Sequence, residues 1–282
     1  MREIVIKSYG KVNLGLDVLY KREDGYHEIS TVMQQIDLSD TVTIRENGGS
    51  ILLESDCQEL PLDSTNLVYR AWKAIQERTG LDRGVQIKIE KNIPLSAGLA
   101  GGSSNAAVVL KGLNELWDLG LDQGELIEIG RSIGADVPFC ITGGTAWAEG
   151  IGEKLTRLRP FRGKDLLLIN PGTRVSTAQV YSSINGGDGK RIDMGKIISS
   201  IEEDDIRGVA ANMENIMEGV VMEKLPIISH IKNDMLRYGA LASLMSGSGP
   251  TVFGLFDDRD KLEYSVKKLK GKYPTVLLAK TI

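Results

Sequence analysis

The segment from residue 94 to residue 104 combines glycines with small polar side chains, a composition that can bind phosphate. Glycine lets the backbone turn tightly and approach a ligand closely. An alternating apolar stretch precedes the segment at 85–89, and a helical apolar stretch follows it at 108–117. A strand, a glycine-rich loop and a helix N-terminus can cradle an anion, because the first helical N–H groups lack intrahelical partners. The residues assigned to this predicted phosphate loop are Pro94, Leu95, Ser96, Ala97, Gly98, Leu99, Ala100, Gly101, Gly102, Ser103 and Ser104.

This phosphate loop differs from two common nucleotide-binding motifs. No Gly-Lys-Ser or Gly-Lys-Thr follows the glycines, so the segment is not a P-loop. It also lacks the Gly-x-Gly-x-x-Gly fingerprint of dinucleotide-binding folds. The predicted cradle therefore consists of the backbone N–H groups from Gly98 to Ser103. A flexible loop that only connects a strand to a helix is the alternative.

A second group of polar residues lies between residues 11 and 27. Lys11 and Asn13 are two positions apart on a predicted strand, so their side chains point to the same, polar face. An Asp-Gly turn precedes Tyr26 and His27 directly, and an aromatic ring beside a histidine can stack on a base and hydrogen-bond its edge. The alternative is a solvated strand face followed by an ordinary turn.

Asp136 is the candidate acid–base residue. It follows a predicted helix and precedes the apolar, proline-containing stretch 137–139. A carboxylate at this place can accept a proton from a substrate hydroxyl, and an adjacent lysine would hold it ionised. Aspartate is also a common turn residue, so a structural role stays open.

A second glycine-rich segment, Ser-Gly-Ser-Gly-Pro-Thr, occupies residues 246–251. Its small residues could line a site from the other domain. We assign Gly247, Ser248 and Gly249 to this role. Small-residue loops are common between strands, so the segment alone is weak evidence of a site.

Length and composition indicate a globular protein. The 282 residues include 41% hydrophobic and 26% charged residues, with a net charge of −4. The sequence shows no Lys/Arg block, so we expect no nucleic-acid partner. It contains neither a secretory leader nor an apolar run of ~18 residues, which predicts a cytoplasmic protein without a membrane partner. Cys57 and Cys140 have no metal-site spacing, so we expect reduced thiols, with Cys140 in the core.

The apolar patterns predict an α+β protein of two domains that meet near residue 160. Strands are expected at 4–6, 12–18, 42–44, 51–53, 85–89, 166–169, 241–245, 251–256 and 275–279. Helices are expected at 67–75, 103–117, 122–133, 193–200, 205–218, 226–238 and 258–270. Asp63 or Ser64 would cap the first helix, and 122–125 resembles a capping box. The residues 47–49 indicate a hairpin turn, and 185–189 a plain loop.

Taken together and in this order, the segments resemble the motifs of the GHMP kinase superfamily. The similar segments are Lys-Val-Asn-Leu-Gly-Leu (11–16), Asp-Gly-Tyr-His (24–27), Gly-Leu-Ala-Gly-Gly-Ser-Ser-Asn-Ala-Ala (98–107), Gly-Ala-Asp-Val-Pro-Phe (134–139) and Ser-Gly-Ser-Gly-Pro-Thr-Val-Phe (246–253). Within the superfamily they are most similar to the kinases that act on 4-diphosphocytidyl-2-C-methyl-D-erythritol. The resemblance spans nearly the whole chain.

The resemblance implies a fold, an activity and two ligands. The fold is a ribosomal-protein-S5-domain-2-like ATP-binding domain over 1–160 and a ferredoxin-like α/β substrate-binding domain over 161–282. The activity is ATP-dependent phosphorylation of the substrate's 2-hydroxyl in the non-mevalonate isoprenoid pathway. The phosphoryl donor would be ATP, accompanied by Mg²⁺. A monomer and a homodimer both stay open.

The resemblance also implies roles for single residues. Asp136 matches the catalytic aspartate, and Lys11 matches its lysine partner. Ser104 is a candidate for a phosphate or Mg²⁺ contact through its hydroxyl. Asn105 occupies a position that is often Asp in relatives, and it is not assigned to Mg²⁺ because it lacks a charge.

The substrate end is implied in the same way. Asn13, Tyr26 and His27 match residues around the cytidine. Tyr181 would sandwich the cytosine against Tyr26, and Thr177 would bond nearby.

Two other functions fit the same motifs. Another GHMP kinase, for homoserine or a mevalonate derivative, would have no cytosine to bind, so the Tyr26–His27 pair would lose its purpose. A non-catalytic sensor of nucleotide and ligand could dispense with Lys11 and Asp136, and this chain keeps both.

Overall fold

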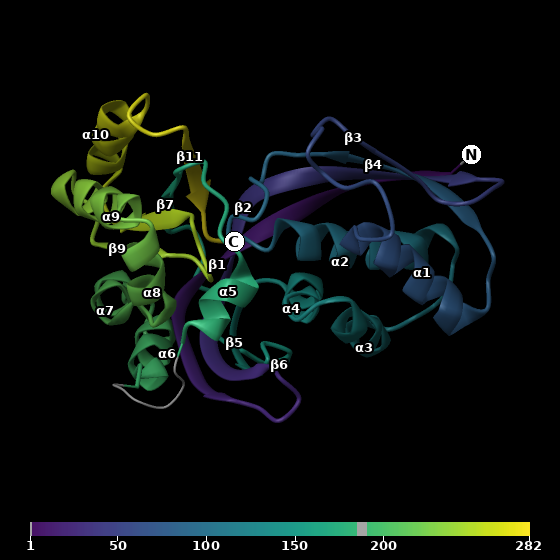
Figure 1. Cartoon of the computed structure of the whole chain (residues 1–282), viewed down its shortest axis with the longest axis horizontal. Helices are drawn as coiled ribbons and strands as arrows, with labels where there is room; N and C mark the ends of the chain where they lie inside the picture. Colours follow the sequence, from purple (N-terminus) through teal and green to yellow (C-terminus); the bar gives the residue numbers. More distant parts are fainter. Residues whose placement is uncertain (1, 185–190) are drawn as a thin grey trace. The chain divides into compact units, whose positions relative to one another are not determined.

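The computed structural model describes residues 2–184 and 191–282 (Figure 1). The loop predicted at 185–189 lies outside these residues. By its internal contacts the chain divides into two compact units. Unit 1 comprises Met1–Gly10, Leu38–Leu95 and Ala100–Gly143, and unit 2 comprises Lys11–Asp37, Ser96–Leu99 and Gly144–Ile282. The units are not consecutive halves of the sequence, and the domain boundary near residue 160 stays a prediction.

Two long strands contribute residues to both units. Strand β1 covers Glu3–Lys21, and strand β2 covers His27–Asn47. In unit 1, strand β4 (Gly84–Glu90) pairs antiparallel with the end of β2, and strand β3 (Leu52–Ser55) pairs parallel with β4. The hairpin predicted at 47–49 is therefore wrong. The apolar strand β4 takes the place beside β2, and the four residues of β3 lie at its outer edge.

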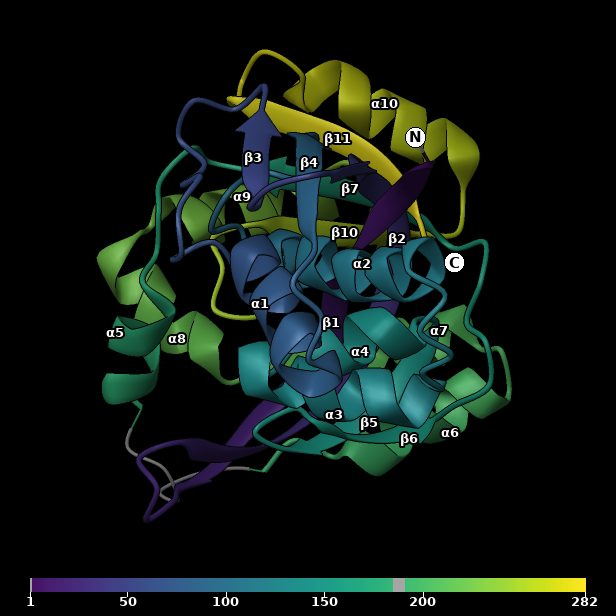
Figure 2. The same cartoon turned by 90° about the vertical axis from the view of Figure 1, so that its right-hand side faces the viewer.

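The helices of unit 1 are α1 (Leu67–Thr79), α2 (Gly101–Leu116), α3 (Gln123–Ile133) and α4 (Val137–Thr142), which Figure 2 shows gathered together. Helix α2 packs closely on β1 and β2, since a Cβ on Gly112 would lie 2.4 Å from Ile44 Cδ1 and 3.1 Å from Ile6 Cδ1.

The helix caps of unit 1 were predicted with mixed success. The capping box of Asp122 and Glu125 at α3 is confirmed. The cap of α1 is Asn66, whose side chain accepts from Val68 N at 2.9 Å. Asp63 instead accepts from Thr65 N in the turn before the helix, so its prediction as a cap is wrong.

Unit 2 contains a four-stranded antiparallel sheet in the order β11-β7-β10-β9. The sheet and the helices that complete this domain are, in chain order, β7 (Asp165–Asn170), α9 (Ile227–Arg237), β9 (Ala242–Met245), β10 (Val252–Phe256), α10 (Arg259–Leu269) and β11 (Thr275–Lys280), with further elements between residues 177 and 224 inserted after β7 (Figure 1). This β-α-β-β-α-β sequence and strand order are those of a ferredoxin-like domain, as expected.

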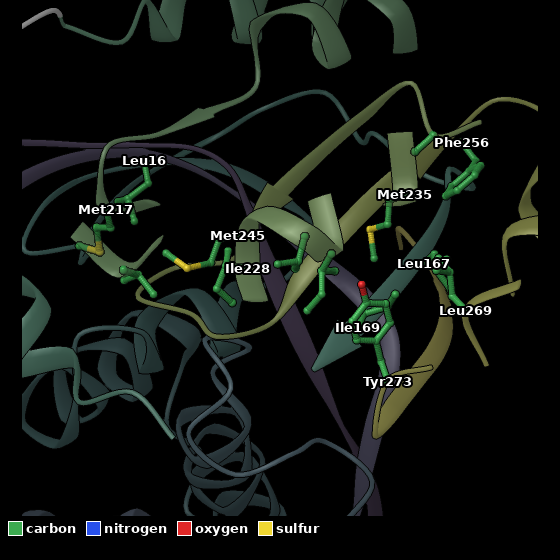
Figure 3. Packing of buried hydrophobic residues seen from close by; sticks show 14 of the residues in the cluster. Leu16, Leu167, Ile169, Met217, Ile228, Met235, Met245, Phe256, Leu269 and Tyr273 are labelled. Carbon is green, nitrogen blue, oxygen red and sulfur yellow. The ribbon is translucent and has the colours of Figure 1, made fainter. Parts of the chain in front are cut away.

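One hydrophobic core holds this sheet, its helices and part of β1 and β2 together (Figure 3). Leu16 reaches it from β1, Leu167 and Ile169 from β7, and Ile228 and Met235 from α9. Burying such side chains is the main favourable contribution to folding, at about 25 cal/mol per Å² of apolar surface.

The remaining elements of unit 2 are strands β5 (Thr145–Gly150) and β6 (Lys154–Arg157), helices α5 (Thr177–Ser182), α6 (Met194–Glu202), α7 (Ile206–Asn212) and α8 (Met217–Lys224), and strand β8 (Glu214–Asn215). The single helix predicted at 205–218 is wrong, because β8 interrupts it by pairing with β1 at Gly15 and Leu16. Among the residues that the structure describes, no helix is both long and apolar enough to cross a membrane.

Candidate active site

Strand β1 carries Lys11 and Asn13 into the interior of unit 2. Their side chains point to one face, as predicted, and Lys11 Nζ donates to Asn13 Oδ1 at 2.7 Å. Asn13 Nδ2 donates to Thr31 Oγ1 at 2.8 Å, and Thr31 Oγ1 donates to Gly15 O at 2.6 Å. Lys11 and Asn13 are only 4% and 2% exposed, so the alternative of a solvated strand face is wrong.

Residues 96–99 of the phosphate loop also belong to unit 2. Lys11 N donates to Leu99 O at 3.0 Å, and Ser246 Oγ donates to Gly98 O at 2.9 Å. Gly98 has φ +75°, and a Cβ there would lie 2.1 Å from Ser246 O. Only glycine fits this position, because the backbone is left-handed and the second glycine loop touches it.

The second glycine loop reaches the polar pair on β1. A Cβ on Gly247, which has φ +56°, would lie 3.4 Å from Asn13 Oδ1 and 3.6 Å from Lys11 Nζ. It would also lie 3.3 Å from Gly98 O. Three motifs that are far apart in the sequence thus meet within unit 2, around one buried lysine.

Asn215 holds the second glycine loop, and sequence reasoning missed it. Its Nδ2 donates to Met245 O and to Gly247 O, both at 2.8 Å, and its Oδ1 accepts from Met217 N at 2.9 Å. The pairing of β8 with β1 fixes its place. An asparagine inside a predicted helix, where it is a poor helix former, was the available signal.

Glu218 was also missed. Its Oε1 accepts from Met245 N at 2.7 Å, just before the second glycine loop, and its other oxygen pairs with Lys232 Nζ. A buried carboxylate that accepts a backbone N–H and an ammonium can fix a loop rigidly.

The predicted substrate-binding residues lie in unit 2, where two of their rings stack on each other. Tyr181 stacks on His27, with ring centroids 5.1 Å apart and planes at 28°. Tyr26 is 59% exposed. Thr177 Oγ1 and Ser248 Oγ share a hydrogen bond at 2.8 Å, which ties α5 to the second glycine loop. Burial, and secondly the charge of nearby Lys21, lower the pKa of His27.

The remainder of the phosphate loop belongs to unit 1, where α2 begins at Gly101. Its N-cap, Ala100, has φ +55° and no side-chain capping bond. The first N–H groups of α2 are therefore not covered by a capping side chain, and together with the helix dipole they favour an anion.

Ser104 lies in this first turn but is 2% exposed. Its hydroxyl donates to Tyr9 O at 2.6 Å and accepts from Ser8 Oγ at 2.9 Å. Because its hydrogen is used by Tyr9, the hydroxyl could offer a ligand only a lone pair.

Asp136 lies in unit 1, half-buried, at the N-cap position of α4. Its side chain makes no capping bond, while its carbonyl accepts from Cys140 N at 3.0 Å. The turn before it borders the first turn of α2, since a Cβ on Gly134 would lie 3.9 Å from Ser103 Oγ. The turn before Asp136 and the start of α2, which contains the last residues of the predicted cradle, are thus neighbours within unit 1.

A dedicated metal site is not evident in residues 2–184 and 191–282, where no group of three or more His, Cys, Asp or Glu could hold an ion. Asn105 is committed to other partners, with Nδ2 bonded to Asp40 and Ser8 and Oδ1, the atom that could ligate a metal, accepting from Lys91 Nζ at 3.4 Å. The residues therefore do not fit a protein-built Mg²⁺ cage. A Mg²⁺ ion held mainly by nucleotide phosphates and water needs no such cage.

Two family models match the chain. The GHMP kinases N terminal domain matches residues 66–144, and the GHMP kinases C terminal model matches residues 197–274. The first range contains the phosphate loop and Asp136, and the second contains Asn215 and the second glycine loop.

Curated relatives match over the full length. A 4-diphosphocytidyl-2-C-methyl-D-erythritol kinase of Acetivibrio thermocellus is 46% identical over 283 residues, covering 100% of both chains. The Clostridium tetani protein of the same name is 47% identical, covering 98% of this chain and 99% of its own.

Solved structures agree with these relatives. The crystal structure of a 4-(cytidine 5'-diphospho)-2C-methyl-D-erythritol kinase has a TM-score of 0.83 at 32% identity and covers 99% of each chain. A homoserine kinase from Cytophaga hutchinsonii has a TM-score of 0.80 at 19% identity, covering 100% of this chain and 95% of its own. At that identity the second likeness shows the fold alone.

Proposed function

We propose that this chain, which belongs to the GHMP kinase family, transfers the γ-phosphoryl group of ATP to the 2-hydroxyl of 4-diphosphocytidyl-2-C-methyl-D-erythritol. The observation that carries the proposal is an identity of 46–47% over essentially the whole chain with relatives that bear this kinase's name. The meeting of β1, the phosphate loop and the second glycine loop in unit 2 supports it.

Asp136 is the proposed acceptor of the hydroxyl proton. Asp136 is half-buried and follows the turn at Gly134 that borders the start of α2, which suits this role, because a phosphoryl acceptor loses its proton as it attacks. Lys11 is proposed to orient the hydroxyl and to offset negative charge. Its burial supports this role, since an ammonium is worth more where water is excluded.

The phosphate loop, residues 94–104, is proposed to cradle the phosphates of ATP. The transition state of phosphoryl transfer spreads negative charge over equatorial oxygens, so positioned N–H donors stabilise it. The uncapped start of α2 supports this assignment. Ser104 is the loop residue whose hydroxyl lone pair could contact a Mg²⁺ ion carried by the nucleotide, and that ion would supply positive charge near the phosphates.

Asn13, Tyr26, His27, Thr177 and Tyr181 are proposed to bind the cytidine end. The stacking of Tyr181 on His27 supports an aromatic wall for a base, and the exposed ring of Tyr26 is available as another. Base stacking on an aromatic ring contributes ~1–3 kcal/mol in nucleic-acid systems. Tyr26→Ala should therefore raise the KM for the cytidyl substrate much more than the KM for ATP.

Domain boundary, location and assembly belong to the same proposal. The two family-model ranges lie on either side of residue 160, which supports a boundary there. A cytoplasmic location is supported by Cys57 and Cys140, neither of which forms a disulfide in the structure. We propose no choice between a monomer and a homodimer.

The test is a phosphotransfer assay with ATP, Mg²⁺ and the cytidyl substrate. The wild type should add a phosphate at the 2-position, and Asp136→Asn should lower kcat by ~10²–10⁴. Asp118→Asn is the control, since this exposed carboxylate of unit 1 forms an ion pair with Arg2 at the surface. A variant within a few-fold of wild type would show that Asp136 is not the base.

The other outcomes separate the alternatives. Transfer to homoserine or a mevalonate-type alcohol, with none to the cytidyl substrate, would identify another GHMP kinase. Tight ATP binding without transfer to any of these alcohols would favour a sensor.

A further inference from the structure

A polar network lies in unit 1 directly behind the start of α2, and the proposed reaction does not yet use it. Its centre is Asp40, which is completely buried. Asp40 Oδ1 accepts from Asn92 N and Ile93 N, both at 2.8 Å. Its Oδ2 accepts from Asn105 Nδ2 at 2.9 Å and pairs with Lys91 Nζ. Four donors thus fill the capacity of one carboxylate.

Lys91 brings a positive charge to an unusual place. Its side chain is 7% exposed, and its Nζ would lie 3.3 Å from a Cβ on Gly101, the first residue of α2. A cation at a helix N-terminus opposes the helix dipole, so it needs a compensating anion. Asp40 supplies that anion, and a buried charge of this kind is costly once its partner is removed.

Asn105 connects Asp40 to the phosphate loop through a series of hydrogen bonds. One Nδ2 hydrogen goes to Asp40, and the other goes to Ser8 Oγ at 2.8 Å. Ser8 Oγ donates to Ser104 Oγ at 2.9 Å, and Ser104 donates to Tyr9 O at 2.6 Å. The hydrogen bonds run outward from Asn105 in two directions, to Asp40 on one side and through Ser8 and Ser104 to the Tyr9 carbonyl on the other, because Asp40 and that carbonyl only accept.

We propose that Asp40, Lys91 and Asn105 are positioning residues for ATP. They hold the first turn of α2 at the angle that its N–H groups need to meet the phosphates. The inference rests on the proposed function, in which that turn cradles ATP. It adds the side chains that set the cradle's geometry, and none of them is among the residues proposed for the alcohol substrate.

The decisive variant is Asp40→Asn. The new amide keeps the shape and can still accept from Asn92 N and Ile93 N. Its Nδ2 would however face two other donors, Lys91 Nζ and Asn105 Nδ2. Asn105 must then turn over to accept, which withdraws its donor from Ser8 and breaks the relay to α2.

The measurement is ATP affinity by calorimetry on the full chain, together with the two KM values. Asp40→Asn should weaken ATP binding by about tenfold or more and raise the KM for ATP by a similar factor. The KM for the alcohol substrate should stay within about twofold of its wild-type value. Asp37→Asn is the matched control. Asp37 lies on the same strand, is exposed, and accepts Lys280 N at 2.7 Å.

A purely structural role would lower the melting temperature of Asp40→Asn while leaving both KM values and ATP affinity unchanged, and that result would overturn the inference. If Asp40→Asn does not fold, Ser8→Ala removes only the link between Asn105 and Ser104. It should weaken ATP binding about threefold to tenfold, and unchanged binding would overturn the inference.

The ATP measurement also separates this inference from the proposed function. Wild-type protein that binds ATP but does not phosphorylate the cytidyl alcohol refutes the proposed substrate and leaves the positioning result readable. Wild-type protein that does not bind ATP refutes both.

Discussion

Behind the start of α2 in unit 1 lie Asp40, Lys91 and Asn105, and behind the second glycine loop in unit 2 lie Glu218, Lys232 and Asn215. Each set consists of a carboxylate, a lysine and an asparagine, and Asp40 accepts from two backbone N–H groups and Glu218 from one. The chemistry is therefore the same in both units.

The two sets differ in depth and in what they hold. The Asp40 and Lys91 side chains are 0% and 7% exposed, whereas those of Glu218 and Lys232 are 10% and 20% exposed. The first set is linked to helix α2 through the side-chain hydroxyls of Ser8 and Ser104. In the second, Asn215 bonds directly to loop carbonyls. A helix is rigid and needs only its angle set, whereas a glycine loop needs its backbone held residue by residue.

The largest effect should come from the glycines of the phosphate loop. Gly98→Ala places a Cβ against Ser246 O at φ +75°, which costs about 1–3 kcal/mol for backbone strain and about 1–3 kcal/mol for overpacking. Gly102→Ala meets only Leu67 Cδ1 at 3.7 Å. Chemical denaturation of both variants checks the contrast.

Similar losses of unfolding free energy in the two alanine variants would mean that the close approach of the two glycine loops does not determine whether position 98 tolerates a side chain. Activity gives a second readout. Gly98→Ala should also lower kcat, because Gly98 and Gly247 lie together beside Lys11.

The difference in burial between the two networks predicts that removing the two carboxylates will lower the unfolding free energy by unequal amounts. Asp40→Ala leaves Lys91 buried without its anion and should cost about 3–5 kcal/mol of unfolding free energy. Glu218→Ala should cost less, about 1–3 kcal/mol, because Lys232 can turn toward water. Urea unfolding of both variants measures the difference. Equal costs would remove the distinction between a deep and a shallow network.

The parts of the site that could be predicted are those with local signals. The same-face placement of Lys11 and Asn13 followed from the period of a strand, and the capping box at α3 from its spacing. The strands and helices of the βαββαβ domain were predicted from apolar runs. Its assignment as a ferredoxin-like domain came from the resemblance to the superfamily.

Asp40, Asn215 and Glu218 could not be predicted, because their roles depend on partners far along the chain. Asp40 meets Asn105 across 65 positions, and Asn215 meets Met245 across 30. The pattern at 205–218 is helical, and only the pairing with β1 turns 214–215 into a strand. The stacking of Tyr181 on His27 was missed for the same reason.

The smallest expected effect is on pH dependence, and it should appear only on the substrate side. The pKa of His27 lies below its usual 6.5, since burial disfavours the charged ring and Lys21 repels it. His27 is therefore neutral at pH 7 and gains its proton only as the pH falls through the lowered pKa. The KM for the cytidyl substrate should then rise modestly in acid, about twofold to fivefold.

The unfolded chain binds this proton at a higher pH than the folded chain, so His27 also makes stability fall as the pH drops below about 6.5. His27→Gln should flatten the acid rise of the cytidyl KM. The KM for ATP should stay level across this range in both proteins, because the residues proposed for the phosphate loop and its network include no histidine. An acid rise that is equal for both substrates would assign it to a group outside the stacked pair, and the contrast between the two sides of the site would then fail.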